Sequence, residues 1–488
     1  MIEFTGRQLE EITGGTLIGC EQSHLFNVPQ FFVDSRSAIR DGVFVALVGE
    51  RVDGHDFLDS VYEVGAALAI VDTAPGRPMV EGLSVLRVLS PLRALAQIAH
   101  WVRVNVLTAQ VIGVTGSSGK TSTKDLIAGI LGHRGETVAP PGSFNTEVGL
   151  PLTILSADAN TEFLILEMGM RGIGHISTLA EIAEPDIGVV VNVGSAHIEL
   201  LGSVENIAEA KSELVRALPA TGTAILNKDD PLVAKMSDSL NCEICTFGEG
   251  QGSDFRSSDL DIEPDGTTRF IITHGGNSRQ AHVQLVGPHY VSNALAAVSV
   301  CVCAGVPFET ACELLSQVNV ISKWRMEVTT AGNDVTVIND SYNANPESMR
   351  AALKTLTQFC SGEPDRRTWA VLGEMCELGE HSLDAHESIG RLAARLNISR
   401  LVCVGKATRV MHLAADNERA WGGESAWVSD VDEALELLAR DLRAGDIVLV
   451  KASRSIGLER VAREVMELSL SSLLTDLDSG NGREQGNL

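Results

Sequence analysis

A glycine-rich turn carries the residue types that bind phosphate groups. It follows an apolar run at residues 111–114 and precedes a helical pattern over residues 122–131. Glycines let main-chain amides turn toward an anion, a helix dipole adds positive potential, and a lysine and a hydroxyl can reach the terminal phosphates and a Mg²⁺ ion. The general spacing would need glycine where Val114 stands, so the loop is the compact form TGxxGKT. We predict nucleotide binding, against the alternative of an ordinary turn with an exposed lysine, by Thr115, Gly116, Ser117, Ser118, Gly119, Lys120, Thr121 and Ser122.

Two more polar residues follow apolar runs that predict buried strands. Glu167 comes directly after residues 163–166, and His197 lies shortly after residues 187–191. Parallel α/β sheets bind their ligands at the carboxyl ends of strands, and carboxylate oxygens are ligands that Mg²⁺ prefers. Glu167 could also cap a helix and His197 could be structural, so both alternatives stay open at this point.

A lysine lies on the apolar face of a predicted helix. Lys211 follows Ile207 by four residues and precedes Leu214 by three, so the helical period places all three on one face. Full burial depresses the pKa of a lysine by up to ~3–5 units. Either the side chain extends along the surface to water, or it is neutral, paired or chemically modified at a functional site.

The strands and helices that would position these residues fall into three predicted domains. A chain of 488 residues is too long for one hydrophobic core. Short apolar runs in residues 1–90 predict a small α/β domain, and continuous apolar runs in residues 91–328 predict a central P-loop-type, mostly parallel sheet flanked by helices. Strands and amphipathic helices alternate again in residues 329–488, which predicts a Rossmann-like domain with a disordered tail from about residue 471. The predicted fold class is therefore α/β.

Composition excludes several classes of protein. Lys and Arg total 38 against 64 Asp and Glu, a formal net charge of -26, and aromatic residues make up 4%. Such a chain does not fit a non-specific nucleic-acid binder. No signal peptide or membrane span is visible, and nine scattered cysteines indicate a reducing compartment, so we expect a cytoplasmic protein. The lone CxxC pair, Cys242 with Cys245, and the glycines of residues 169–174 are weak signals for zinc and NAD.

Taken together, these residues and several separated motifs resemble the Mur ligases of peptidoglycan synthesis. The resemblance covers the whole chain except the C-terminal tail. Its family-wide marks are the phosphate loop, His197 and the runs NTEVGLP (145–151), EMG (167–169), AEAKSE (208–213), NKDDP (227–231) and HYVSNA (289–294). One branch of the family is indicated by NDSYNANPESM (339–349), LGEMCELG (372–379), KASRS (451–455), DSR (34–36) and FVAL (44–47).

The resemblance implies a role for each matching residue in an ATP-dependent ligase with two Mg²⁺ ions. Lys120 would bind the γ-phosphate, Thr121 and Glu167 would hold one ion, and His197 with a carbamylated Lys211 would hold the other. Lys120, His197 and Lys211 would be the catalytic residues. The nucleotide would also meet Asn293, which faces the adenine, and Arg325, Asp340, Tyr342 and Asn343. The UDP-sugar side would be bound by Ser35, Arg36, Asn145 and Thr146.

Several of these residue types would also suit purely structural roles. Arg325 could form an interdomain salt bridge instead of meeting the nucleotide, and Tyr342 could serve loop packing. Asn345, which stands before a proline, is equally a helix N-cap. Two histidines farther along, His381 and His386, are expected to be solvent-facing helix residues without a role.

The indicated branch implies two substrates, a UDP-N-acetylmuramoyl-tripeptide and D-alanyl-D-alanine. A carboxylate is a poor electrophile, so ATP would convert the terminal carboxylate of the tripeptide into an acyl phosphate, which the dipeptide amine attacks. Another Mur-type ligase or a folylpolyglutamate synthase-like ligase is the enzymatic rival, although the Asp-Asn-Pro-Arg run of the ligase that adds the third amino acid does not occur. A nucleotide-gated binding module is the non-enzymatic rival. We expect a monomer that closes its domains around the nucleotide.

Overall fold

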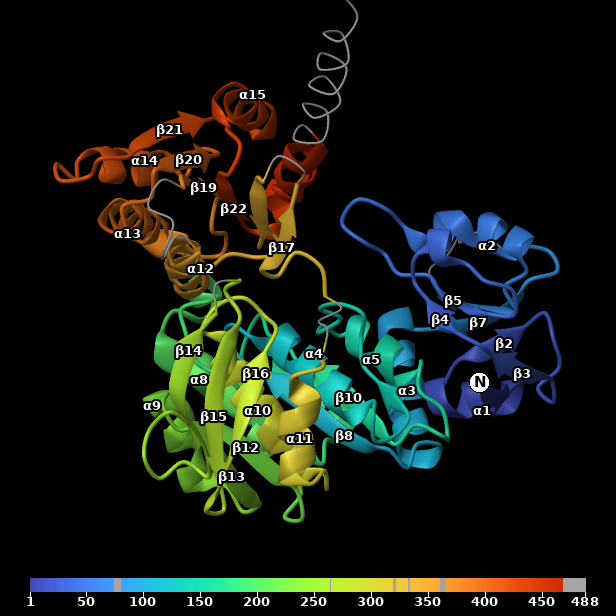
Figure 1. Cartoon of the computed structure of the whole chain (residues 1–488). Helices are drawn as coiled ribbons and strands as arrows, with labels where there is room; N and C mark the ends of the chain where they lie inside the picture. Colours follow the sequence, from blue (N-terminus) through green and yellow to red (C-terminus); the bar gives the residue numbers. More distant parts are fainter. Residues whose placement is uncertain (74–79, 264, 319–321, 332–333, 360–365, 468–488) are drawn as a thin grey trace, which may run out of the picture.

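Four β-sheets organise the described part of the computed structural model (Figure 1). The structure describes residues 1–73, 80–263, 265–318, 322–331, 334–359 and 366–467, and the predicted disordered tail lies outside them. The sheets and the helices around them confirm the predicted α/β class and its mostly parallel central sheet. Within these ranges, no helix combines the length and the apolar character that crossing a membrane requires.

The N-terminal part contains a five-stranded sheet and a two-stranded ribbon. The sheet has the order β2-β7-β6-β5-β4, with β2 antiparallel to β7 and the other pairs parallel, and the ribbon pairs β1 with β3. The elements are β1 (Ile2–Thr5), α1 (Gly6–Thr13), β2 (Thr16–Ile18), β3 (Leu25–Val28), β4 (Phe31–Phe32), β5 (Val43–Val45), α2 (Leu58–Val64), β6 (Leu68–Asp72) and β7 (Ser84–Val88). Phe4 and Leu9 share one apolar core with Ile98 and Val102 of α3 (Pro91–Asn105), so α3 joins this part to the central domain.

The central sheet has the order β16-β15-β14-β13-β12-β11-β8-β10-β9, parallel from β9 to β14 and antiparallel beyond. Its strands are β8 (Gln110–Thr115), β9 (Thr137–Val138), β10 (Phe163–Glu167), β11 (Ile187–Val190), β12 (Thr223–Asn227), β13 (Glu243–Gly248), β14 (Phe255–Ile262), β15 (Thr268–His274) and β16 (Asn277–Val283). Its helices are α4 (Lys120–Leu131), α5 (Gly149–Ile154), α6 (His175–Ala183), α7 (Ile198–Leu201), α8 (Val204–Arg216), α9 (Pro231–Ala234), α10 (Tyr290–Cys303) and α11 (Phe308–Leu315). Because helices cover the sheet, β10 and β11 are buried along their whole lengths, as their continuous apolar runs predict.

The C-terminal sheet has the order β17-β18-β22-β19-β20-β21, in which only the β17–β18 pair is antiparallel. Its elements are β17 (Glu327–Thr330), β18 (Thr336–Asn339), α12 (Pro346–Gln358), β19 (Thr368–Leu372), α13 (Ser382–Arg395), β20 (Arg400–Val404), α14 (Arg409–Asp416), β21 (Glu424–Val428), α15 (Val431–Asp441) and β22 (Ile447–Lys451). The sheet thus starts at Glu327, beside the predicted limit at 328. The predicted domain limits at 90 and 328 stay predictions.

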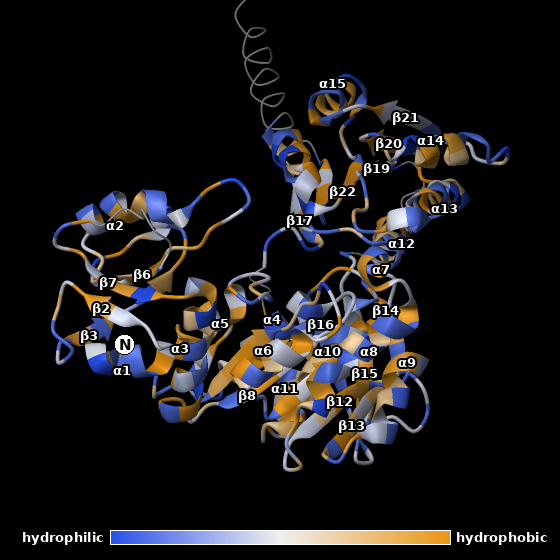
Figure 2. Cartoon of the chain, turned by 180° about the vertical axis from the view of Figure 1, so that it is seen from behind, coloured by the Kyte–Doolittle hydropathy of each residue, from blue (hydrophilic) through white to orange (hydrophobic). Residues whose placement is uncertain are grey.

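Helix starts and helix faces follow the local sequence. Asn345 caps α12 through a capping box with Ser348, and Pro346 occupies the first turn, so the N-cap role of Asn345 is confirmed. Hydrophilic and hydrophobic residues share the surface of helices such as α15, whose apolar side packs on the sheet (Figure 2). The prediction of a solvent-facing His386 is wrong, because its ring is buried and its Nε2 accepts the Met375 N–H at 3.0 Å.

Candidate active site

A cavity of about 550 Å³ lies between the central and C-terminal domains. The phosphate loop and the start of α10 form its central-domain wall. The segment after β18, the start of α12 and the last residue of β22 form the opposite wall. The predicted residues that line it are Ser117, Ser118, Gly119, Lys120, Thr121, Ser122, Asn145, Glu167, His197, Asn293, Arg325, Asp340, Tyr342 and Asn343. Residues far apart in the sequence therefore meet at one site, as a nucleotide clamped between two domains would need.

The phosphate loop turns sharply between β8 and α4. Gly119 has a φ of +79°, a left-handed conformation that favours glycine, and a Cβ there would clash with the side chain of Asn293. The Lys120 ammonium donates to the Gly116 carbonyl at 2.6 Å. Asn192, after β11, accepts the Ser118 N–H at 2.9 Å and so holds the loop from the neighbouring strand. The turn thus has the form of a phosphate cradle at a helix N-terminus.

Glu167 is buried at the carboxyl end of β10, beside the phosphate loop. Its two carboxylate oxygens accept different donors: the Thr121 hydroxyl at 2.7 Å and the Asn145 amide at 2.8 Å. The Ser143 hydroxyl lies 2.9 Å from that of Thr121. This is a set of oxygen ligands around one carboxylate, which suits Mg²⁺ completed by substrate phosphates and water.

Arg325 reaches from the segment before β17 into the central domain. Its Nη2 donates to the hydroxyls of Thr121 at 2.8 Å and Ser143 at 3.1 Å. Its guanidinium lies 4.3 Å from the centre of the Tyr342 ring. Both neighbours of Arg325 have left-handed backbone, with φ of 61° at Trp324 and 51° at Met326. Across the described ranges Arg325 makes no ion pair, so the interdomain salt bridge is not its contact.

A buried lysine lies close to the partly buried Lys120 of the phosphate loop. Lys211 is 1% exposed on α8, which agrees with the face predicted for it and rules out extension of the side chain to water. Burial holds the pKa of Lys211 well below its usual value, and the nearby Lys120 charge lowers it further. Burial also lowers the pKa of Lys120, against an opposing effect of Glu167. No hydrogen bond of the Lys211 ammonium occurs with any residue that the structure describes. Such a site favours an anionic ligand or a modified lysine.

His197 faces the C-terminal domain. Its Nδ1 lies 2.6 Å from a carboxylate oxygen of Glu377. This contact holds the pKa of Glu377 below its ordinary value. Both residues have left-handed backbone, with φ of 66° at His197 and 61° at Glu377. Nearby, the Glu347 carboxylate accepts the Ser195 hydroxyl at 2.9 Å, so a second polar contact crosses the same interface.

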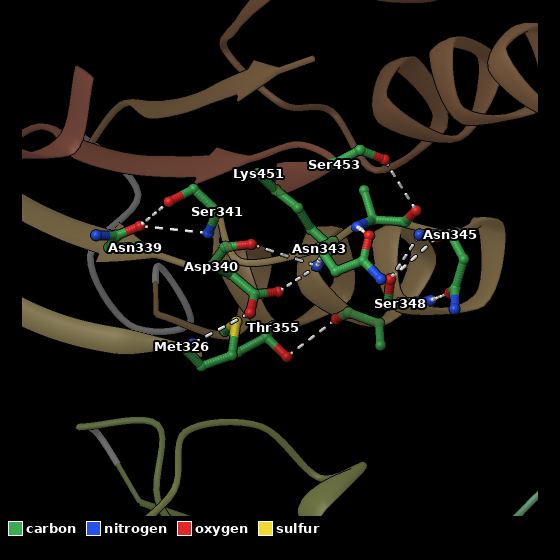
Figure 3. Close-up of polar contacts among 12 residues, drawn as sticks. Met326, Asn339, Asp340, Ser341, Asn343, Asn345, Ser348, Thr355, Lys451 and Ser453 are labelled. Atoms are coloured by element: carbon green, nitrogen blue, oxygen red, sulfur yellow. Dashed lines mark hydrogen bonds and ion pairs between the residues drawn. The ribbon is translucent and has the colours of Figure 1, made fainter. Parts of the chain in front are cut away.

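A buried lysine organises the C-terminal wall of the cavity (Figure 3). Lys451 ends β22 and is 2% exposed. Its ammonium lies 2.6 Å from the Asp340 carboxylate and donates to the Asn343 carbonyl at 2.8 Å. Asp340 in turn accepts the Met326 N–H at 3.2 Å, next to Arg325. Lys451 therefore fixes the turn that brings the C-terminal residues to the phosphate loop.

Other predicted residues lie outside the cavity. Thr115 and Gly116 belong to the phosphate loop but, like Thr146 and Lys211, do not line the cavity. Ser35 and Arg36 lie on the N-terminal domain. Arg36 is exposed and pairs with Asp34 at 2.6 Å, which lowers the pKa of Asp34 to about 2. The structure therefore does not bring the Ser35 and Arg36 pair together with the nucleotide residues.

The site residues without a predicted role include Ser143, Asn192, Glu377 and Lys451. Lys451 carries a recognisable signal, because it ends an apolar run in the same way as Glu167. Asn192 follows β11 and carries the same signal in a weaker form. Ser143 and Glu377 lie in irregular segments, where no periodicity could have identified them.

His289, which lines the cavity, should make the stability of the folded protein depend on pH. Burial lowers its pKa from 6.5 to about 4, and its Nδ1 has no hydrogen-bond partner among the described residues. Between pH 6.5 and 4 the unfolded chain binds a proton that the folded chain does not. Lowering the pH through this range should therefore decrease the free energy of unfolding by up to about 3 kcal/mol. Urea unfolding at pH 7 and pH 4.5 should show a smaller loss in His289→Gln than in the wild type. Equal losses would contradict this assignment.

The cavity residues fit Mg²⁺ bound through few protein ligands. Among the described residues no group of three or more His, Cys, Asp or Glu is arranged to hold a metal. Mg²⁺ is commonly held by one or two carboxylates together with substrate phosphates and water, rather than by a cage of protein ligands. Glu167 with the Thr121 hydroxyl provides such a partial set.

Comparisons with known proteins agree with this geometry. Residues 114–301 match the Mur ligase middle domain, and residues 324–454 match the Mur ligase, glutamate ligase domain. The chain is 42% identical over 496 residues to UDP-N-acetylmuramoyl-tripeptide--D-alanyl-D-alanine ligase of Mycobacterium bovis, covering 95% of this chain and 97% of that protein. Among solved structures, MurF from Acinetobacter baumannii has a TM-score of 0.82 at 28% identity, covering 96% of this chain and 99% of the other. MurF ligase from Thermotoga maritima in complex with ADP has a TM-score of 0.75 at 30% identity, covering 91% and 98%.

Proposed function

Because this chain belongs to the Mur ligase family, we propose that it joins D-alanyl-D-alanine to a UDP-N-acetylmuramoyl-tripeptide in a reaction driven by ATP. The observation that carries the proposal is similarity along the full length of a relative of that name, together with a cavity that unites the phosphate loop with the C-terminal domain. The products would be a UDP-linked pentapeptide, ADP and phosphate. Since the reaction consumes ATP, we expect it to take place in the cytoplasm.

The cavity supports ATP as the nucleotide. Lys120 and the loop amides would bind the terminal phosphates, and Asn293, which meets the loop at Gly119, would face the adenine. From the C-terminal side, Arg325 would approach the transferring phosphate, with Asp340, Tyr342 and Asn343 around the nucleotide. A guanidinium placed there stabilises charge that develops during phosphoryl transfer.

Two Mg²⁺ ions would neutralise phosphate charge when bound. We propose that Thr121 and Glu167 hold one ion and that His197 and a carbamylated Lys211 hold the other. Carbamylation joins a neutral amine to CO₂ and releases a proton, so the depressed pKa of the buried Lys211 favours it. The product is an anionic oxygen ligand, which Mg²⁺ prefers to an amine.

The reaction would proceed through an acyl phosphate. A carboxylate oxygen of the tripeptide attacks the γ-phosphorus, and the bond to the ADP oxygen breaks. The deprotonated amine of D-alanyl-D-alanine then attacks the acyl carbonyl, and the tetrahedral intermediate expels phosphate. Near neutral pH one proton is released overall. The chain contributes position and charge: Lys120 and the loop amides hold the phosphates, and the domain contacts exclude water.

The sugar end of the substrate would lie toward the N-terminal domain. We propose that Ser35 and Arg36 on that domain, with Asn145 and Thr146 beside the phosphate loop, bind the UDP-sugar side. A long nucleotide-peptide substrate could extend from the exposed Arg36 to the cavity. A monomer stays a prediction, and so does the assignment of these four residues.

An isotope experiment tests both the substrates and the mechanism. The protein is incubated with ATP, MgCl₂, D-alanyl-D-alanine and a UDP-N-acetylmuramoyl-tripeptide labelled with ¹⁸O in its terminal carboxylate. We expect the pentapeptide by mass spectrometry and one ¹⁸O atom in each phosphate released. Tripeptides ending in lysine and in diaminopimelate are run in parallel to identify the third residue.

The rival functions give different results in the same assay. A ligase that adds single amino acids would form product with an amino acid and not with the dipeptide, and a folylpolyglutamate synthase-like enzyme would extend a folate with glutamate. A binding module would release no ADP when both substrates are added. Pentapeptide formation without ¹⁸O in the phosphate would support the proposed substrates but contradict the acyl-phosphate intermediate.

A further inference from the structure

An irregular loop supplies part of the active site without support from regular secondary structure. Residues 139–148 connect β9 to α5. Ser143, within this loop, contacts the Thr121 hydroxyl and accepts from Arg325. Asn145 donates to Glu167. The loop thus holds two side chains against the residues assigned above to phosphate and metal. The Gly169 N–H, after β10, donates to the Asn145 carbonyl at 2.8 Å and fixes the end of the loop that is nearer to α5.

A second lysine of α4 anchors the other end of the loop. Lys124 stands four residues after Lys120 and is 1% exposed. Its ammonium donates to the Pro140 carbonyl at 2.5 Å and lies 2.6 Å from the Asp125 carboxylate. Pro140 and Pro141 have no N–H groups, so this stretch cannot be tied to its neighbours by ordinary main-chain donation. This stretch can still accept hydrogen bonds through its carbonyls, and the Pro140 carbonyl accepts from the buried lysine of the helix.

We propose that Lys124 is a positioning residue for phosphoryl transfer, which anchors the loop at Pro140 so that Ser143 and Asn145 meet Thr121 and Glu167. Lys124 does not line the cavity, so it acts through the loop and not by touching substrate. The inference rests on the proposed ATP-dependent reaction and adds a residue to which that reaction gives no role.

The test has to separate the effect of Lys124 on the loop from its effect on the stability of the protein. Asp125 supplies the counter-charge of Lys124, and its other oxygen, Oδ2, is buried without a hydrogen-bond partner in the described parts of the chain. Removal of Lys124 alone would leave a buried, unpaired carboxylate, and the resulting instability would mask any effect on the loop. Replacing both charges by apolar residues of similar size avoids that penalty and isolates the lost bond to Pro140.

The test combines this charge-free pair with the loop side chain. Lys124→Met/Asp125→Leu, Ser143→Ala and the triple variant are compared with the wild type for kcat, KM for ATP and urea unfolding. Lys228→Met is the control, because Lys228 also donates to a main-chain carbonyl, that of Gly252, from an exposed position away from the cavity. Lys124→Arg, which keeps a positive charge beside Asp125, is run in parallel and guards against an unstable double variant.

We expect the double variant to lose about 30-fold in kcat with little change in unfolding midpoint, since a misplacement of about 1 Å can cost a factor of that order. Ser143→Ala should lose roughly tenfold, and the triple variant no more than the double, because both changes remove the same contact. The control should match the wild type. A double variant within threefold of the wild type, or losses that multiply in the triple variant, would overturn the proposal. A wild type that forms no pentapeptide would instead contradict the proposed function.

Discussion

Replacement of Lys120 by alanine should lower kcat/KM for pentapeptide formation at least about 100-fold, equivalent to ~3 kcal/mol of transition-state stabilisation. Lys120 lines the cavity, and its ammonium sits over the loop at 2.6 Å from the Gly116 carbonyl. The next lysine along α4, Lys124, cannot replace it, because its side chain is directed into the protein toward Pro140. Initial rates of ADP release with both peptide substrates measure the loss.

Lys228→Ala provides the control for Lys120, since Lys228 is a lysine of the same domain that contacts Gly252 and not the cavity. It should retain the activity of the wild type. Unfolding curves of both variants should resemble that of the wild type, which would assign the loss to chemistry. A loss of less than tenfold in Lys120→Ala would contradict the role given to this residue.

Replacement of Lys451 by methionine should destabilise the C-terminal domain by about 3–5 kcal/mol, because it leaves Asp340 partly buried without its partner. It should also lower turnover, since the turn from Asp340 to Asn343 loses its anchor. Tryptophan fluorescence during urea unfolding can measure the first effect, as four of the five tryptophans lie at Trp324, Trp369, Trp421 and Trp427.

A second variant separates stability from activity at this pair. Lys451→Met/Asp340→Leu removes both charges and should recover most of the lost stability, because no unpaired charge stays buried. It should not recover turnover, since Asp340 would be absent from the nucleotide site. If Lys451→Met unfolded within about 1 kcal/mol of the wild type, the ion pair would not organise this wall of the cavity.

Much of the fold could be predicted because the physical signals are local. Buried parallel strands appear as continuous apolar runs, and polar residues at their carboxyl ends, such as Glu167, are placed at the site by topology alone. The helical period likewise predicted the buried position of Lys211. The phosphate loop depends on a short contiguous segment whose conformation is determined by Gly119 and the start of α4.

The rest of the site depends on contacts that no local pattern encodes. Ser143 reaches Thr121 because a lysine on another element holds its loop, and Glu377 meets His197 only across a domain interface. The error at His386 has a similar cause: a histidine on an amphipathic helix looks exposed until the main chain of Met375 is folded over it. Such pairings follow from tertiary packing and not from spacing.

The left-handed residues at the interface of the central and C-terminal domains affect how the enzyme would reopen. His197 and Glu377 face each other, and Trp324 and Met326 flank Arg325, all with positive φ. Each such conformation costs an L residue roughly 1–2 kcal/mol. Domain separation would let these residues relax, so the docked arrangement carries a built-in tendency to come apart. Ligands that touch both domains would have to outweigh that tendency, and their conversion to products would free the molecule for another turnover.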